Sequence, residues 1–277
     1  MKLTMLGTGN ASAIECYNTC YIFSSEGQHF LVDTGGGNQI LKRLSDAQIP
    51  LEEIHDIFLT QEHLEYVLGC FWLMLKIGDL MNQGAYVGAL NIYCCSPLIE
   101  KLCAALELML PPDIMAHIGR DILFVAVEHG DQLKLLDSDV TFFDIGSGEK
   151  GKLGFTLVTR DGIKLACCGD EPYHVENEEF IRESDWLLHE AYCMQEEAER
   201  YKEESWNHST VKEACEIAER LGISNLILYH MEDMHMRDRK EIYSREGMQC
   251  YSGKLHIPDD LECFEIARSL RFPGALH

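Results

Sequence analysis

The chain has 277 residues, and its 46 Asp and Glu outnumber its 23 Lys and Arg to give a formal charge of −23. Such an acidic surface repels phosphate backbones and disfavours large nucleic acids as partners. With 46% hydrophobic and 25% charged residues, a disordered or fibrous chain is excluded. The sequence shows neither an apolar run of about 20 residues nor an export signal, so we expect a cytoplasmic, non-membrane protein.

The length fits a single domain covering residues 1–277. Twelve cysteines occur without any Cys-x-x-Cys spacing, and two adjacent pairs lie inside apolar segments. Neighbouring side chains on a strand point to opposite faces and cannot jointly hold a metal ion. We therefore expect most of the cysteines to be reduced residues of the core.

The first half of the chain predicts short strands that alternate with helices. Short apolar runs bounded by Gly or Asn are typical of strands. They occur at residues 2–6, 20–24, 30–33 and 54–60. Apolar residues at helical spacing predict helices at 38–48, 64–81 and 97–110. Pro111 and Pro112 end the third helix.

The second half returns to strands and then alternates strands with helices. Further strands are predicted at residues 122–127, 133–136, 140–145, 153–159, 163–168, 186–189 and 226–229. Asp161-Gly162 predicts a hairpin, and helices are predicted at 190–202 and 210–221. Thr210 and Glu213 form a predicted capping box for the last helix. The order of elements indicates two packed sheets with helices outside, an α/β fold.

Several polar residues share one position, the loop just after an apolar strand. These residues are Asp33, Gln61, His63, Glu65, Asp170, His189, Glu190 and His230. Rigid scaffolds present catalytic groups at strand ends. A single residue of this kind is more often a turn or capping residue, but the repetition favours a functional site.

Six segments, in this order and spacing, resemble the metallo-β-lactamase superfamily and, within it, the ribonuclease Z-like branch. They are MKLTMLGTGN (1–10), LVDTGG (31–36), Gly169-Asp170, His189-Glu190-Ala191, His208-Ser209-Thr210 and LILYH (226–230). The resemblance covers the chain to about Asp259. It implies a four-layer αββα sandwich, a two-metal site that usually holds zinc, and hydrolysis by a metal-bound hydroxide.

The metal-binding motif of this family, His-x-His-x-Asp-His, is altered here. Only His63 is unchanged, whereas Gln61, Glu65 and Tyr66 replace the first His, the Asp and the last His. Gly146 stands where the family has a further His. The two remaining ligand positions are intact, because they hold Asp170 and His230.

These losses predict a reduced metal site. Of the two metal ions that the family binds, one would keep only His63 and Asp170 as ligands, and two ligands seldom hold zinc. A single ion held by His63, Glu65, Asp170 and His230 is one interpretation, and this mixed set suits zinc, manganese or iron. A site without metal is the other. Asp33 and His189 are assigned supporting rather than ligand positions.

The resemblance gives His208 the task of protonating the leaving oxygen and Glu190 that of orienting His208. Glu65 is also predicted to be catalytic, as the third donor of an open metal site that could activate water. The alternative is that His208 caps the following helix and Glu190 is a solvated helix residue. We favour the catalytic roles for this pair. The segment 70–120 has few basic residues, so we expect a small phosphodiester or other anionic ester as substrate. The competing function is a catalytically inactive anion-binding or partner-subunit protein. Whether the chain forms a homodimer is left open.

Overall fold

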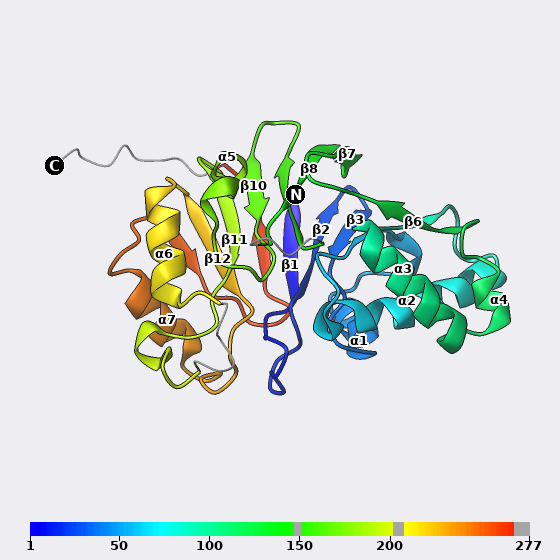
Figure 1. Ribbon diagram of the computed structural model, residues 1–277, viewed down its shortest axis with the longest axis horizontal. Helices are drawn as coiled ribbons and strands as arrows, with labels where there is room; N and C mark the ends of the chain where they lie inside the picture. Colours follow the sequence, from blue (N-terminus) through cyan, green and yellow to red (C-terminus); the bar gives the residue numbers. More distant parts are fainter. Residues whose placement is uncertain (147–150, 202–207, 269–277) are drawn as a thin grey trace.

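A computed structural model describes residues 1–146, 151–201 and 208–268. Its strands form two seven-stranded mixed sheets that pack face to face, with helices on both outer faces (Figure 1). This confirms the predicted αββα sandwich. Among the described helices, none is long and apolar enough to cross a membrane.

The first sheet has the strand order β14-β1-β2-β3-β4-β5-β6. Its strands are β1 (Lys2–Gly7), β2 (Cys20–Ser25), β3 (Gln28–Val32), β4 (Ile54–Phe58), β5 (Leu90–Cys94), β6 (Ile122–Ala126) and β14 (Cys263–Glu265). The helices α1 (Gln39–Asp46), α2 (Leu64–Asn82), α3 (Ser96–Met109) and α4 (Pro112–Met115) lie on its outer side (Figure 1). Strands β3 to β6 run parallel, so the loops after β3 and β4 leave the same edge.

The second sheet has the order β13-β12-β11-β10-β9-β8-β7. Its strands are β7 (Gln132–Leu135), β8 (Ser138–Asp144), β9 (Leu153–Val158), β10 (Lys164–Cys167), β11 (Trp186–Glu190), β12 (Asn225–Tyr229) and β13 (Lys254–His256). It is covered by α5 (Glu178–Ile181), α6 (Val211–Arg220) and α7 (Arg239–Gly247) (Figure 1). Strands β10 to β13 run parallel, which brings the ends of β10, β11 and β12 to one edge.

The aromatic core between the sheets holds the two halves together. Phe23 and Phe30 of the first sheet contact Phe155 of the second in edge-to-face geometry, with ring centroids 6.2 and 5.8 Å apart. All three rings are fully buried. Such pairs add about 0.5–1.5 kcal/mol each beyond the area they bury. This packing fixes the position of one sheet's loops against the other's.

Three details test the predicted elements of the second sheet. The hairpin at Asp161-Gly162 is confirmed, because β9 and β10 pair antiparallel on either side of it. The capping box is also confirmed, since Thr210 accepts from Glu213 N and Glu213 accepts from Thr210 N. The helix predicted at 190–202 is wrong over its described residues. Glu190 ends β11, and the segment contains only a 3₁₀ turn at Gln195–Glu197.

The physical reason for this error is burial around Glu190. Glu190, Ala191 and Cys193 have no exposed surface, so the chain passes through the interior where a surface helix was expected. Residue 202 lies outside the described residues. Sequence patterns also gave no prediction for α7 or for β13 and β14. These two strands have three residues each and are too short to show a hydrophobic period.

Candidate active site

The strand ends of both sheets surround one cavity of about 510 Å³. The cavity is lined by Asn10, Ala11, Ser12, His63, Glu65, Lys152, Asp170, Glu171, Tyr192, His208 and His230. Five of these residues were predicted as site residues from the sequence. The loops after β4, β10 and β12 deliver His63, Asp170 and His230, as expected for polar residues that follow apolar strands.

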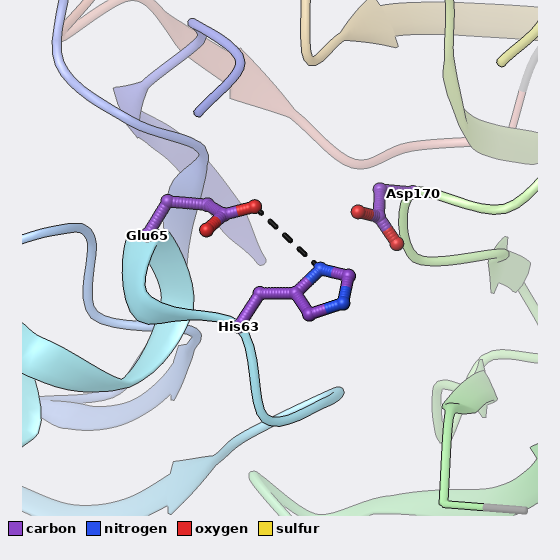
Figure 2. Close-up of side chains that lie close together, drawn as sticks. All are labelled: His63, Glu65 and Asp170. Carbon is purple, nitrogen blue, oxygen red and sulfur yellow. Dashed lines mark ion pairs between the residues drawn. The ribbon is translucent and has the colours of Figure 1, made fainter. Parts of the chain in front are cut away.

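Three predicted ligands, His63, Glu65 and Asp170, line the cavity and form a compact group (Figure 2). One ligand atom from each lies within 4.8 Å of the other two. His63 Nδ1 is 3.7 Å from Glu65 Oε1, and the His63 side chain is 48% exposed. Asp170, by contrast, is buried. An imidazole with two carboxylates fits a three-ligand site for a single divalent ion.

Two of the replacing residues bond directly to the retained Asp170. The Tyr66 hydroxyl lies 2.8 Å from Asp170 Oδ2 and 2.8 Å from His230 Nδ1. Gln61 Nε2 donates to the other carboxylate oxygen, Oδ1. Gln61, Tyr66, Asp170 and His230 are all buried. Protein hydrogen bonds thus join residues that would be metal ligands in the family.

The geometry assigns the tautomer of His230. A hydroxyl has one proton, and the Tyr66 proton goes to the Asp170 carboxylate, which can only accept. His230 Nδ1 must then carry a proton and donate it to the Tyr66 oxygen. Nε2 is left with a lone pair. His230 is not a member of the compact group of three ligands, although it lines the same cavity.

Burial and the neighbouring groups together set the charges of His230 and Asp170, which both bond to Tyr66. Burial lowers the pKa of His230 to about 4, despite the opposing charge of Asp170, and the imidazole is neutral at pH 7. Burial would raise the pKa of Asp170, but the imidazole of His230 and the Tyr66 hydroxyl hold it below the usual value. Asp170 is therefore a carboxylate, the form that accepts both hydrogen bonds and can bind a metal ion.

Glu190 and His208 form a pair beside His230, with the His208 and His230 ring centroids 4.8 Å apart. Glu190 is fully buried, its Oε1 accepts from Ser209 N at 2.7 Å, and its Oε2 is 3.5 Å from His208 Nδ1. Burial would lower the pKa of His208, but the Glu190 carboxylate outweighs this and raises it. The alternative interpretation, in which His208 caps the next helix and Glu190 is a solvated helix residue, is wrong in both parts. Thr210 caps α6, and Glu190 is not a solvated helix residue.

Three further predicted positions do not line the cavity. The Asp33 carboxylate accepts from Thr60 N at 2.9 Å and Thr60 Oγ1 at 2.9 Å, so it holds the loop that leads to Gln61. His189 is fully buried, with Nδ1 2.7 Å from the carbonyl oxygen of Glu190. Gly146 N donates to Asp144 Oδ1 at 2.9 Å. Asp33 and His189 thus take structural positions beside the site, and the loop with Gly146 follows β8.

Sequence reasoning missed Lys152, Glu171 and Tyr192. Lys152 Nζ lies 2.5 Å from Glu171 Oε1, and both line the cavity. The Tyr192 ring stacks on His208 with centroids 5.5 Å apart. The position of Lys152 follows from strand pairing, because it precedes β9, and β9 pairs with β8 and β10. Glu171 directly follows Asp170, a signal that was available from the sequence.

Comparisons with known proteins agree with the fold. Residues 1–249 match a family described as "Anti-Pycsar protein Apyc1". Ribonuclease Z of Archaeoglobus fulgidus is 25% identical over 96% of this chain and 97% of its own length. The metallo-β-lactamase fold protein YhfI from Bacillus subtilis has a TM-score of 0.77 at 18% identity, covering 95% of this chain and 98% of its own.

The short form of human tRNase Z has a TM-score of 0.72 at 19% identity, covering 96% of this chain and all of its own length. The resemblance to the metallo-β-lactamase superfamily, ribonuclease Z-like branch, is therefore confirmed.

Proposed function

Since the chain belongs to the family of the anti-Pycsar protein Apyc1, we propose that it is a metal-dependent hydrolase of a small phosphodiester or other anionic ester. It would use one divalent ion, with zinc first and manganese or iron as alternatives. The observation that carries this proposal is the group of His63, Glu65 and Asp170, whose ligand atoms face the same cavity as the Glu190 and His208 pair.

The charge of the cavity supports the need for a metal ion. Its described lining contains three carboxylates, Glu65, Asp170 and Glu171, against one ammonium group, Lys152. With the histidines neutral this lining is acidic and disfavours an anion. A divalent ion would cancel that excess, and a protonated His208 would add a positive charge near the substrate. Anion binding would therefore depend on the metal ion.

Each residue has a distinct role in this proposal. His63, Glu65 and Asp170 would hold the metal ion, which supplies Lewis acidity and lowers the pKa of a bound water. His208 would give a proton to the leaving oxygen, while Glu190 keeps the imidazole protonated and oriented. His230 would hold the Tyr66 and Asp170 pair in place. Glu65 would also lie beside the attacking water.

The cavity and the charge of the chain favour a small substrate. A volume of about 510 Å³ is in the range of small-molecule sites. Lys152 is the one Lys or Arg residue in the described lining, whereas RNA binding needs many phosphate contacts. The name of one structural relative, tRNase Z, refers to a nucleic-acid substrate. The net charge of −23 argues against that class here.

A second function has its own supporting observation. Gln61 and Tyr66 donate to both oxygens of Asp170, and Tyr66 also pairs with His230, so these residues have hydrogen-bond partners without any metal. A protein that had lost metal chemistry would need such replacements. In that case the cavity would bind a ligand, or the chain would serve as the subunit of an active relative, without hydrolysis.

The test is metal content and hydrolysis of bis(4-nitrophenyl) phosphate by protein purified without added metal. We expect Asp170→Asn to abolish metal binding at this site and the hydrolysis that depends on it. Gln61→Ala is the matched control, because it removes a hydrogen bond to the same carboxylate and no ligand, and it should change metal content little. An Asp170→Asn protein that binds metal and turns over as well as the parent would refute the proposal.

A further inference from the structure

A second group of metal-ligating side chains lies outside the candidate active site. One ligand atom from each of Glu197, Glu232 and His235 lies within 4.8 Å of the other two. Glu197 ends the 3₁₀ turn after β11, whereas Glu232 and His235 lie between β12 and α7. None of the three residues lines the cavity described above. Segments separated by more than 30 residues in sequence thus bring their side chains to one point.

Contacts with neighbouring residues orient the three side chains. His235 Nε2 lies 2.9 Å from Glu197 Oε1, and Asp238 Oδ1 lies 3.8 Å from the other ring nitrogen. Metal-binding imidazoles commonly have a carboxylate on the side away from the metal. Glu232 is buried, and Tyr243 donates to its Oε1 at 2.9 Å, which fixes the carboxylate.

Two buried polar atoms at this group lack a hydrogen-bond partner among the described residues. They are Glu197 Oε2 and the hydroxyl of Tyr201, a residue that is only 8% exposed. Tyr201 follows Glu197 by one turn, and its N–H donates to the Glu197 carbonyl at 3.2 Å, so both side chains leave the same face. A buried hydroxyl without a hydrogen-bond partner costs folding free energy unless a bound ligand provides that partner.

The position of the Tyr201 hydroxyl relative to the carboxylates follows from two observations. Its ring packs on Tyr192 with centroids 5.6 Å apart, and the carbonyl of Tyr192 accepts from Glu232 N at 2.9 Å. Tyr201 is thus connected to Glu197 through the backbone and to Glu232 through Tyr192.

Apart from the His235 imidazole, which is 2.9 Å from Glu197 Oε1, positive charge at this group is sparse. The guanidinium of Arg200 approaches Glu197 only to 4.0 Å and is largely exposed. Arg239 is buried nearby, but it donates to the carbonyl of Glu232 and not to its carboxylate. Two neighbouring carboxylates repel each other unless a cation lies between them.

We propose that Glu197, Glu232 and His235 bind a second divalent metal ion, zinc before manganese, at a site separate from the candidate active site. The hydroxyl of Tyr201 would hold a water molecule that completes the coordination. Such an ion joins the segment after β11 to the segment after β12. It thereby braces Tyr192, whose ring stacks on His208 in the active-site wall.

This site changes how metal content must be interpreted. Its donor set, two carboxylates and one imidazole, equals that of His63, Glu65 and Asp170. Both sites would therefore take the same ions. A content of about two metal ions per chain would then come from two separate mononuclear sites and would not indicate a dinuclear active site.

The experiment measures zinc per chain, and zinc affinity by competition with a chromogenic chelator, in four full-length proteins. These are the parent, Asp170→Asn, the pair Glu197→Gln with His235→Gln, and the combination of all three changes. Glu197 and His235 are partly exposed, so their amide replacements leave the core intact. We expect about two, one, one and zero zinc ions. Affinity at the second site should fall at least about 100-fold when ligands are lost.

Two further measurements keep the result specific. His129→Gln, which replaces an exposed histidine outside both groups, should bind zinc like the parent. Zinc should raise the thermal unfolding temperature of Asp170→Asn but not that of the combined variant. Loss of zinc only in Asp170→Asn would overturn this inference and leave the proposed function intact. Loss only in the Glu197→Gln and His235→Gln pair would support this inference and refute the metal site of the proposed function.

Discussion

The hydroxyl of Tyr66 donates a hydrogen bond of 2.8 Å to Asp170 Oδ2 inside the protein. The same oxygen lies 2.8 Å from His230 Nδ1, so one phenol joins two residues that match metal ligands of the superfamily. Tyr66 occupies the last position of the altered motif. The loss of an imidazole there is thus also the gain of a hydrogen bond that keeps Asp170 ionised and oriented.

Replacing Tyr66 with Phe should destabilise metal-free protein strongly. The change leaves a buried carboxylate without one of its donors, and hydrogen bonds to charged groups contribute about 1.5–3 kcal/mol. We expect a loss of this size in the free energy of unfolding, measured with urea in the presence of a chelator. Tyr17→Phe is the control, because the acceptors within reach of the Tyr17 hydroxyl are the neutral carbonyls of Thr34 and Gly37. It should cost about 0.5–1.5 kcal/mol, and equal costs for both variants would contradict the role given to Tyr66.

Restoring the imidazoles should restore metal binding. Gln61→His, Tyr66→His and Gly146→His together remove both donors from Asp170 and add three ligands of the superfamily pattern. We expect one more metal ion per chain than in the parent, when both carry Glu197→Gln and His235→Gln to remove the second site. The rate of hydrolysis of bis(4-nitrophenyl) phosphate should rise together with the metal content. If the triple variant gains metal but hydrolyses no phosphodiester, the binding-protein alternative is favoured over catalysis.

Glu190→Gln tests whether His208 acts as a proton donor. An amide oxygen can still accept from Ser209 N, but the charge that raises the pKa of His208 is lost. Proton donation matters most for poor leaving groups and contributes about 10²–10⁴-fold to rates. We expect the rate on an alkyl phosphodiester to fall at least about tenfold more than the rate on a 4-nitrophenyl ester. Glu213→Gln, which alters only the α6 capping box, should lower neither of these two hydrolysis rates.

The sequence predicted the sandwich and the cluster of polar strand ends because both depend on local patterns. Apolar runs, the Asp161-Gly162 turn and the Thr210 cap are each encoded within a few residues. The hydrogen bonds of Tyr66 could not be predicted in this way. Asp170 and His230 are 104 and 164 residues distant from it, and only the packing of the two sheets brings them together.

The same limit explains the residues that sequence reasoning missed or misplaced. Lys152 enters the cavity because β9 pairs with β8 and β10, a register that the sequence does not specify. Glu190 was expected to begin a surface helix over residues 190–202. Its carboxylate is instead fully buried and accepts from Ser209 N. A charged residue in the interior contradicts its ordinary preference, and such exceptions are common at functional sites.

The approach of α2 to the loop after β3 gives a last prediction. Gly69 N donates to Gly35 O at 2.9 Å, and a Cβ on Gly69 would lie 2.0 Å from the carbonyl oxygen of Thr34. Thr34 in turn donates from N and Oγ1 to the Tyr66 carbonyl at 2.9 and 2.6 Å. A side chain at 69 must therefore push apart two backbones that position Tyr66.

We expect Gly69→Ala to cost at least about 1–3 kcal/mol in the free energy of unfolding, as overpacked cores do. It should also weaken metal binding at His63, Glu65 and Asp170, since Glu65 lies on the same turn of α2 as Tyr66. Gly37→Ala is the matched control, because a Cβ there has no heavy atom within 4 Å and its φ is not positive. Urea unfolding and zinc titration of both variants make the comparison. A Gly69→Ala protein as stable as Gly37→Ala would show that α2 can shift without disturbing the site.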